Sequence, residues 1–554
     1  MVVVSIQINF HTHALLLFFQ YLYPIHCRHN DYFCLFKKPK LHFVTMDKDN
    51  LTPVKSVLIS LFHKEPAAEL IQTLAESGVT IYSTGGTLNF IREMGWEAIP
   101  VEELTKYPSV FGGRVKTLHP KVFGGILHRR DNESDLNELS LHGIPSIDMV
   151  IVDLYPFEKT VESGAEENEI IEKIDIGGIS LIRAAAKNFQ YTWVVASSDL
   201  YPAATEILKN QDNATRLSQR KEFAAHAFNV SSHYDTAILG YLAPDDYSSF
   251  RKSIQEHKKL RYGENPHQKG FFYGDLNQVF TQLHGKELSY NNLLDIDGAV
   301  ALISEFDEPT FAIIKHTNAC GLATRQNIRD AYRDALASDP ISAFGGILIA
   351  NRNIDRDTAY DINELFFEVI LAPDYENEAL QVLKQKKNRI ILKLNNLNQQ
   401  NWHFRSALNG VLAQSANTKQ TPQEDWSTAT ISGPDNKTAE DLLFANKIVK
   451  HTKSNAIVLA ANKQLLASGT GQTSRVDALK QAIVKAREFN HSLKGAVMAS
   501  DAFFPFADCV EIAHKEGINA VIQPGGSVRD KDSTDFCNEH AMIMVMTGTR
   551  HFKH

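Results

Sequence analysis

Short apolar runs alternate along much of this chain with segments whose apolar residues recur at helical spacing. The clearest runs cover residues 54–60, 79–83, 147–154 and 311–314, and each predicts a buried strand. Amphipathic helices are predicted between them, one opened by Pro66 with Leu70 and Leu74 on its apolar face, another carrying Leu88 and Ile91. Strands that alternate with amphipathic helices predict an α/β fold.

The stretch FAIIKHTNACG at residues 311–321 combines a predicted strand with ionisable residues that could transfer protons. Its first four residues predict a strand, and the chain then turns polar, so Lys315 and His316 are expected where the strand gives way to a loop. Ligands of open α/β sheets bind at such strand ends. A histidine titrates near neutral pH, and a partly desolvated lysine can be tuned towards the same range. Proton transfer and a solvated Lys-His pair are both compatible with this stretch alone.

Several segments in the first half also place polar groups at predicted strand ends. Thr84-Gly-Gly-Thr87 lies between a strand and a helix, where free N–H groups and the helix dipole favour an anion, although a tight turn would read the same way. The loop at residues 111–120 combines two glycines with Arg114 and Lys116, which suits a phosphate clamp. The apolar runs near residues 154, 174 and 186 each end beside ionisable side chains.

Composition limits the possible partners. A length of 554 residues exceeds a single core and suggests about three or four domain-sized units. The formal net charge of −8 predicts no general attraction to nucleic acid or to an anionic membrane, so local groups must hold any phosphate. The five cysteines are scattered without a C-x-x-C pair, which argues against a disulfide framework or a zinc site and suits a reducing cytoplasm.

Residues 1–45 differ from the rest of the chain. Their apolar and aromatic run at residues 14–23 is too short to span a bilayer, and the basic start and cleavage site of a secretory signal are missing. From Met46 the composition is that of an ordinary soluble N-terminus. We expect an upstream start codon to have been chosen and residues 1–45 to be dispensable; a membrane anchor is the alternative.

Two further patterns point elsewhere. GTGQTS at residues 469–474 resembles a dinucleotide-binding fingerprint, but Ser474 occupies the third glycine position, so a nicotinamide-dependent oxidoreductase is a weak alternative. The basic run at residues 384–389 is expected to be a solvated surface rather than a nucleic-acid patch.

Four motifs in the first half resemble the inosine monophosphate (IMP) cyclohydrolase domain of the bifunctional purine biosynthesis proteins. They are GGRVKTLHP at 112–120, LYPF at 154–157, IDIGG at 174–178 and AAAKN at 184–188. In that family the domain has a methylglyoxal synthase-like fold. Such domains also serve as regulatory modules that sense a phosphorylated ligand, so a non-catalytic N-terminal domain is the alternative function.

A second set of motifs resembles the family's aminoimidazole carboxamide ribonucleotide (AICAR) transformylase domain. The set comprises LRYGENPHQ at 260–268, LSYNNLLD at 288–295, SDPISAFGG at 338–346, KSNA at 453–456, GTGQTSR at 469–475, SDAFFPF at 500–506, QPGG at 523–526 and RHFKH at 550–554. The resemblance implies a domain of two cytidine deaminase-like α/β units. The predicted organisation is an extension at 1–45, a cyclohydrolase domain at 46–202, a connecting helical segment at 203–250 and a transformylase domain at 251–554.

The resemblance also implies roles for residues. For formyl transfer, with 10-formyltetrahydrofolate as co-substrate and no metal, the catalytic residues would be Lys315, His316 and Asn455, Asp530 would position the folate, and Arg261, Tyr262 and Asn292 would hold the ribonucleotide. For ring closure of formylated AICAR (FAICAR) to IMP, the catalytic residues would be Lys116, Tyr155, Asp175 and Lys187. The 5′-phosphate and its surroundings would contact Ser60, Lys64, Thr84, Gly85, Gly86, Thr87, Arg114 and Thr117.

The family works as a cytoplasmic homodimer whose transformylase sites use both subunits, and the resemblance implies the same here. Two residues depart from its usual pattern. Phe62 stands where a small residue is common, and Asp153 stands where an asparagine is common. We expect the extra carboxylate to weaken binding of an anionic substrate unless a cation compensates.

Overall fold

The computed structural model describes residues 51–244, 248–396 and 401–554. The chain forms two compact units that divide between Ser231 and Ser232. Each is described here by itself, as the N-terminal and the C-terminal unit. The predicted extension at residues 1–45 lies outside the described residues.

Within the N-terminal unit, the described residues form a sheet of five parallel strands in the order β4-β3-β2-β5-β6. The strands are β2 (Ser56–Ser60), β3 (Thr80–Ser83), β4 (Ile99–Pro100), β5 (Met149–Val152) and β6 (Trp193–Val195). The predicted strands at 54–60, 79–83 and 147–154 are confirmed, each slightly shortened at its ends. Strands buried on both faces read as unbroken apolar runs, which is why the sequence shows them clearly.

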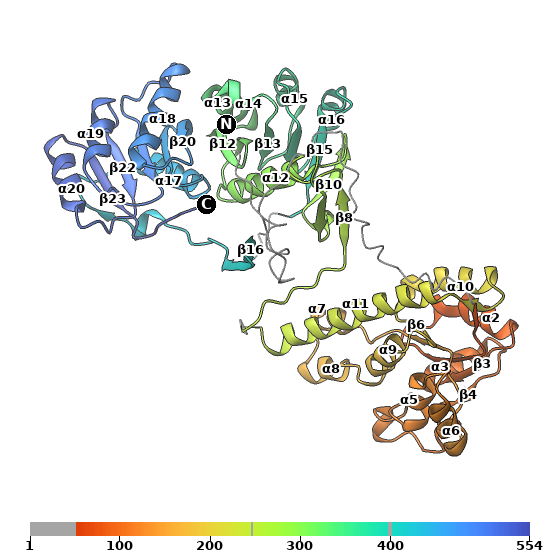
Figure 1. Cartoon of the computed structure of the whole chain (residues 1–554). Coiled ribbons are helices and arrows are strands. Elements are labelled where there is room, and N and C mark those ends of the chain that lie inside the picture. Colours follow the sequence, from red (N-terminus) through yellow and green to blue (C-terminus); the bar gives the residue numbers. More distant parts are fainter. Residues whose placement is uncertain (1–50, 245–247, 397–400) are drawn as a thin grey trace, which may run out of the picture. The chain divides into compact units, whose positions relative to one another are not determined.

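Helices cover both faces of this sheet (Figure 1). One face packs against α2 (Ala68–Glu76), α3 (Gly85–Glu93) and α10 (Tyr201–Asn210), and the other packs against α5 (Pro120–Leu127) and α9 (Gly177–Lys187). The remaining helices of the region are α4 (Val101–Thr105), α6 (Glu133–His142), α7 (Phe157–Glu162) and α8 (Glu167–Glu172). The predicted helices that carry Leu70 and Leu88 are therefore confirmed as α2 and α3.

The segment predicted to connect the domains begins on the N-terminal unit. After α10, strand β7 (Ala214–Thr215) pairs with β1 (Thr52–Pro53), and the long helix α11 (Leu217–Leu242) follows. Its residues Phe223 and Ala227 are buried in the cores of that unit. The domain boundaries at residues 202 and 250 stay predictions.

In the C-terminal unit, the described residues form one mixed sheet of twelve strands. Its order is β10-β15-β14-β13-β11-β12-β20-β19-β21-β22-β23-β18. The first half contains β10 (Phe280–His284), β11 (Thr310–Lys315), β12 (Asn318–Thr324), β13 (Ile347–Ala350), β14 (Val369–Ala372) and β15 (Ile390–Leu394). The second half contains β18 (Ser427–Thr428), β19 (Ile457–Ala461), β20 (Gln464–Gly469), β21 (Val497–Ser500), β22 (Ala520–Gln523) and β23 (Ile543–Met546).

The two halves repeat one pattern, which matches the two α/β units expected of this region. The first repeat runs from α12 (Tyr290–Ile303) through the β11–β12 hairpin and α13 (Ile328–Ser338) to β15, with α15 (Arg356–Asn363) and α16 (Asn377–Leu383) between its later strands. The second repeat runs from α17 (Asn436–Lys450) through the β19–β20 hairpin and α18 (Arg475–Glu488) to β23, with α19 (Asp508–Lys515) and α20 (Asp530–Glu539).

Helices α12 and α17 bury one face of the large sheet, and the other six bury the opposite face. Three smaller features complete the unit: the short helix α14 (Pro340–Ala343), the two-stranded sheet of β8 (His257–Leu260) and β9 (Gly270–Tyr273), and the hairpin of β16 (Trp402–Ala407) and β17 (Gly410–Ser415). The α/β fold predicted for both halves of the chain is confirmed.

The prediction of a polar loop after Ile314 is correct for its first residues and wrong for the rest. The chain turns over only His316 and Thr317, and Asn318 to Gly321 belong to β12. Cys320 and Gly321 lie in β12 and pack against neighbouring elements, so the polar residues of this segment do not mark a loop. A side chain on Gly321 would lie 2.0 Å from the carbonyl oxygen of Ala335 in α13, so this strand needs a glycine to meet its helix.

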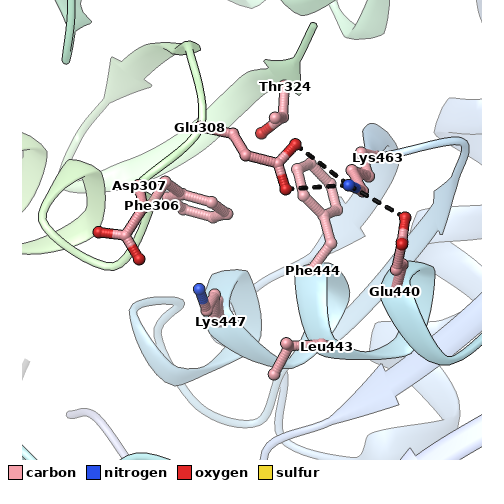
Figure 2. Close-up of a pocket in the computed structure, with 9 residues that line it drawn as sticks. All are labelled: Phe306, Asp307, Glu308, Thr324, Glu440, Leu443, Phe444, Lys447 and Lys463. Carbon is pink, nitrogen blue, oxygen red and sulfur yellow. Dashed lines mark hydrogen bonds and ion pairs between the residues drawn. The ribbon is translucent and has the colours of Figure 1, made fainter. Parts of the chain in front are cut away.

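The two repeats meet at β12 and β20, which share one register pair, Ala323 with Gln464. Polar contacts close the two ends of this seam. At one end the Asn318 side chain accepts a hydrogen bond from the Lys453 backbone N–H at 2.9 Å. At the other end Lys463 forms ion pairs at 3.0 Å with Glu308 of the first repeat and with Glu440 of its own (Figure 2). The Phe306 and Phe444 rings, 5.6 Å apart, form the apolar floor below these ion pairs.

Buried charges connect α12 to the C-terminus of the chain. The Glu305 carboxylate accepts hydrogen bonds from Lys450 at 2.8 Å and from His451 at 2.9 Å. Burial alone would raise the pKa of Glu305, but these partners lower it to about 2. Burial and the nearby Lys450 ammonium lower the pKa of His551 to about 4, and burial also lowers the pKa of His451.

The C-terminal unit is therefore expected to lose stability in mild acid. His551 has a lower pKa in the folded chain than the 6.5 of an unperturbed histidine, so the unfolded chain binds the proton first as the pH falls from 6.5 to 4. At about 1.4 kcal/mol per pH unit, full protonation costs roughly 3 kcal/mol. Urea unfolding at pH 7 and pH 5 should show a smaller loss of unfolding free energy in His551→Gln than in wild type. Equal losses would contradict the assignment.

Candidate active sites

A cavity of about 630 Å³ opens at one edge of the N-terminal sheet. Ten residues predicted for ring closure or phosphate binding line it: Ser60, Lys64, Thr84, Gly86, Thr87, Arg114, Lys116, Thr117, Tyr155 and Asp175. They come from five separate stretches of the sequence, so the tertiary fold brings them together.

The position of this cavity follows from the strand order. In sequence order, β2 is the first strand of this sheet. The next two strands, β3 and β4, lie on one side of it, and β5 and β6 lie on the other, so the direction of winding reverses beside β2. Ligands of parallel sheets bind at the carboxyl ends of strands where this happens. Ser60 ends β2, Thr84 follows β3, and Tyr155 follows β5, so all three lie at that edge.

Two lysines converge on the glycine turn that begins α3. A side-chain carbon built on Gly85 would lie 3.6 Å from Lys116 Nζ, and one on Gly86 would lie 3.3 Å from Lys64 Cε. Gly85 also has a positive φ of 44°, which favours glycine. Thr84 caps α3 through its backbone alone, so the first N–H groups of the helix have no side-chain acceptor. Two ammonium groups beside these N–H groups form a suitable cradle for a phosphate.

The predicted acid–base groups lie next to this cradle. Burial raises the pKa of Asp175, although the Gly178 backbone N–H, which donates at 2.7 Å, and the Lys116 ammonium oppose the rise. Burial and the Asp175 carboxylate together raise the pKa of Tyr155. A carboxyl group whose pKa is moved towards neutral pH is suited to passing a proton to a reacting group.

Asp153, the unusual carboxylate of this site, is used by the neighbouring loop. Its two oxygens accept hydrogen bonds from the backbone N–H groups of Phe62 at 2.5 Å and His63 at 2.9 Å, and Oδ2 also lies 3.0 Å from the imidazole Nδ1 of His63. Phe62 packs its ring edge-on against Tyr155 at 5.4 Å. The two departures from the family pattern therefore form one local arrangement that holds the loop between Ser60 and Lys64.

Two residues predicted for this site are not among those that line the cavity. Gly85 is the exposed first residue of α3 and lies beside Lys116. Lys187 is the last residue of α9 and is exposed. The role given to Lys187 stays a prediction.

In the C-terminal unit, Lys315 and His316 stand at the turn of the β11–β12 hairpin. Lys315 ends β11, and its Nζ donates to the carbonyl oxygen of Phe344 at 2.8 Å. His316 is exposed. Both residues line a cavity of about 240 Å³ whose walls come from both repeats, with Asp339 on one side and Gln481 and Lys485 on the other.

An ion pair that sequence reasoning did not assign crosses this cavity. The Lys485 ammonium contacts the Asp339 carboxylate, which also accepts a hydrogen bond from Ser342 Oγ at 2.7 Å. Burial alone would raise the pKa of Asp339, but these donors outweigh it and lower the pKa. Asp339 belongs to the SDPISAFGG motif, so the motif carried the only sequence signal for it.

Asn455 is held by residues of the second repeat. Its Nδ2 donates to the carbonyl oxygen of Gln472 at 3.0 Å, and its Oδ1 accepts from Arg475 at 2.9 Å. Arg475 also forms an ion pair at 2.8 Å with Asp501, which is fully buried. Arg475 ends the GTGQTSR motif, but only the folded structure shows that it orients the Asn455 amide.

Comparison with known proteins identifies the family. The family model described as "AICARFT/IMPCHase bienzyme" matches residues 185–485, and the model described as "MGS-like domain" matches residues 67–180. A protein named "Bifunctional purine biosynthesis protein PurH" from Bacteroides thetaiotaomicron is 59% identical over 501 residues, which cover 90% of this chain and 99% of that protein. The chain belongs to the bifunctional purine biosynthesis protein family.

Other members of this family are also similar over their whole length. The proteins of the same name from Aquifex aeolicus and Acetivibrio thermocellus are 46% and 45% identical, and each match covers 90% of this chain and 99% or 100% of the relative. A solved structure titled "Crystal structure of ForH" is 31% identical over 34% of this chain and 96% of its own, with a TM-score of 0.30.

Two other residues predicted for formyl transfer, Asn292 and Asp530, lie outside the lining of the cavity at Lys315. Asn292 is buried, and its side chain completes the N-terminal capping box of α12 with Ser289. The Asp530 carboxylate accepts the backbone N–H groups of Gly526 and Ser527 at 2.6 Å and 3.1 Å. None of these residues lines the cavity at Lys315.

Arg261 and Tyr262 also lie outside that lining. They follow β8, and the Arg261 guanidinium donates to the Tyr262 hydroxyl at 2.8 Å. The substrate-binding roles given to Arg261, Tyr262, Asn292 and Asp530 stay predictions.

The described residues contain no group of three or more His, Cys, Asp or Glu side chains placed to hold a metal ion. Across the same residues, none of the helices combines the length and the apolar character that crossing a bilayer requires.

Substitutions at Asp153 test the arrangement that replaces the usual asparagine. Asp153→Ala removes both acceptors of the 62–63 backbone, so we expect the loop to loosen and the KM for the formylated ribonucleotide to rise about tenfold, the equivalent of one charge-assisted hydrogen bond. Asp153→Asn keeps one acceptor and should change KM by less than about threefold. Steady-state kinetics of ring closure measure both variants, and similar KM values for alanine and wild type would refute the role.

Proposed function

We propose that this protein carries out the last two steps of de novo purine biosynthesis. The first step transfers a formyl group to AICAR, and the second closes the product FAICAR to IMP with loss of water. The observation that carries the proposal is the presence of two separate cavities, one in each unit, each lined by predicted catalytic residues of one step. Family membership supports both activities.

Formyl transfer joins a poor nucleophile to the formyl carbon of a folate. The amine nitrogen of AICAR bonds to that carbon, the bond from the carbon to the folate nitrogen breaks, and the amine proton leaves as the folate nitrogen gains one. The step needs a base, a donor for the tetrahedral oxyanion and an acid for the leaving nitrogen. We assign 10-formyltetrahydrofolate as the donor molecule.

The hairpin turn supplies suitable groups for this step. The exposed His316 imidazole can accept a proton through the carboxamide of the substrate, and the Lys315 ammonium lies beside it in the sequence and lines the same cavity. Asn455, held by Arg475, would orient the formyl oxygen. A side chain whose rotamer is fixed by a neighbour is the kind that catalysis by positioning requires.

Ring closure has both reacting groups on one molecule. The carboxamide nitrogen adds to the formyl carbon, and the resulting hydroxyl leaves as water. Orientation supplies much of the acceleration in such reactions. The lysine and glycine cradle would hold the 5′-phosphate, while Asp175, Tyr155 and Lys116 would move protons and stabilise charge in the same cavity.

These extra groups favour catalysis over ligand sensing in the N-terminal unit. A sensor of a phosphorylated ligand needs only the phosphate cradle. Here the cavity that contains the cradle is also lined by Asp175 and Tyr155, both with pKa values raised by burial. Purified protein supplied with AICAR and 10-formyltetrahydrofolate should produce IMP, and accumulation of FAICAR without IMP would favour the sensing alternative.

The protein is further proposed to act as a cytoplasmic homodimer whose transformylase sites use both chains. Arg261 and Tyr262, proposed to hold the ribonucleotide, do not line the cavity at Lys315 of the same chain. In addition, β16 and β17 form a two-stranded sheet of their own among the described residues, and both strands expose apolar side chains, including Phe404 and Leu412. A two-stranded hairpin is marginally stable alone, and exposed apolar side chains on it favour contact with a partner chain.

The two activities should be separable. Lys315→Ala removes a proposed proton donor of formyl transfer, so its rate should fall by about 10²- to 10⁴-fold while FAICAR supplied directly is still closed. Lys116→Ala and Lys187→Ala should do the reverse, and Lys187 tests a residue outside the cavity lining. Separate assays of the two steps measure each variant, and equal losses of both activities in one variant would contradict independent sites.

Mixed dimers test the shared site. Lys315→Ala and Arg261→Ala chains are each inactive in formyl transfer under the proposal, but a mixed dimer contains one intact site of two. With random exchange half of the dimers are mixed, so activity should recover to about a quarter of wild type. Lys315→Ala mixed with Asn455→Ala is the matched control, since the Lys453–Asn455 segment contacts the hairpin of its own chain, and no recovery is expected. Recovery in neither mixture would refute the shared site.

A further inference from the structure

The turn that presents His316 has an unfavourable backbone conformation. His316 and Thr317 have positive φ values of 50° and 64°, as a two-residue hairpin turn of this type requires. Glycine and asparagine adopt these angles most easily, whereas a β-branched threonine does so rarely. Neighbouring residues must therefore hold this turn in place.

Asp295 on α12 is the first residue that does so. Its Oδ1 accepts the backbone N–H of Thr317 at 2.7 Å. One helical turn later, Gly298 lies against the same residue, where a side-chain carbon would be in van der Waals contact with the Thr317 carbonyl oxygen at 3.5 Å. The turn is thus hydrogen-bonded to α12 at Asp295 and packed against it at Gly298.

The second repeat holds its hairpin turn in the same way, but that turn carries no proposed catalytic residue. Its hairpin turn consists of Asn462 and Lys463, both with a φ of 51°. Asp441 on α17, the helix that corresponds to α12, accepts the backbone N–H groups of both residues at 2.9 Å and 2.6 Å. Asp295 and Asp441 therefore do equivalent work, but only the first supports a turn that carries proposed catalytic residues.

Asn318 holds the turn from the other side. Its Nδ2 donates to the carbonyl oxygen of His316 at 2.9 Å, and its Oδ1 accepts the backbone N–H of Lys453 at 2.9 Å. The two contacts set the orientation of the amide, since a flipped amide would place donor against donor and acceptor against acceptor. Lys453 is two residues before Asn455, so one side chain links the His316 turn to the Asn455 segment.

We propose that Asp295 and Asn318 are positioning residues for formyl transfer, which set His316 relative to Asn455 through their hydrogen bonds to the backbone of the turn and of Lys453. The inference rests on the proposed function of this site. A displacement of about 1 Å at a reacting group can cost two orders of magnitude in rate, so loss of either contact should lower kcat rather than raise KM.

The internal repeat provides a matched control. Asp295→Ala and Asp441→Ala each remove an aspartate that holds a hairpin turn, and Asp441 loses the larger number of hydrogen bonds. We expect kcat of formyl transfer to fall at least tenfold in Asp295→Ala and to change less than twofold in Asp441→Ala. Asp295→Asn, which keeps an acceptor for Thr317, should restore most of the rate.

A second variant covers the case in which Asp295→Ala does not fold. Asn318→Ser keeps a short hydroxyl but cannot bridge His316 and Lys453, and it should also lower kcat at least tenfold. In both variants the KM for AICAR should stay within about threefold and ring closure of supplied FAICAR should be unchanged. Glu308→Gln, which weakens the ion pair at the far end of the seam, is the control for Asn318 and should leave kcat unchanged.

The outcomes distinguish the positioning role of Asp295 and Asn318 from the proposed function on which it rests. Wild-type kcat in both Asp295→Ala and Asn318→Ser would overturn the positioning role, as would equal losses in Asp295→Ala and Asp441→Ala. A wild-type protein that closes FAICAR but transfers no formyl group would overturn the proposed function instead.

Discussion

The antiparallel seam between β12 and β20 is the constraint on which the C-terminal unit depends. The two repeats share one register pair there, so the strands alone do not set the distance between them. Polar side chains add contacts between the repeats at the two ends of the seam. Asn318 contacts Lys453 at one end, and Lys463 contacts Glu308 at the other. Since Asn318 contacts both the His316 turn and Lys453, the geometry of that end of the seam is also the geometry of the proposed site.

An internal repeat explains why one hairpin can carry chemistry while the other serves structure. Both turns have left-handed backbones held by an aspartate from the preceding helix. In the first repeat the turn follows Lys315 and opens on a cavity lined by groups of both repeats. In the second repeat Lys463 is neutralised by two glutamates and closes the seam (Figure 2). The same backbone arrangement thus supports the proposed catalytic pair in one repeat and an ion pair across the seam in the other.

The N-terminal unit builds its site by a different rule. All its sheet strands are parallel, so their carboxyl ends lie along one edge, and reversal of the winding beside β2 leaves that edge open. Lys64 and Lys116 lie against the glycines at the start of α3, where they would compensate the charge of the proposed phosphate. Asp153 also lines this cavity, and both of its carboxylate oxygens accept hydrogen bonds from the backbone of Phe62 and His63.

The sequence by itself determined the elements whose signals are local. Apolar runs located β2, β3, β5 and β11, and the motifs at residues 112–120, 154–157 and 174–178 named most residues that line the N-terminal cavity. The expected α/β fold and the family both followed from these local patterns.

Only the tertiary structure decided the rest, because those features depend on partners distant in the sequence. Asn318 is expected in a loop from the sequence, and its link to the second repeat depends on Lys453, more than 130 residues away. Arg475 has no local signal that it holds Asn455, and the Asn292 amide donates at 3.2 Å to Glu368, which is 76 residues away in the sequence. Hydrophobic periodicity reports burial along one element, whereas the direction of a hydrogen bond depends on which elements pack against each other.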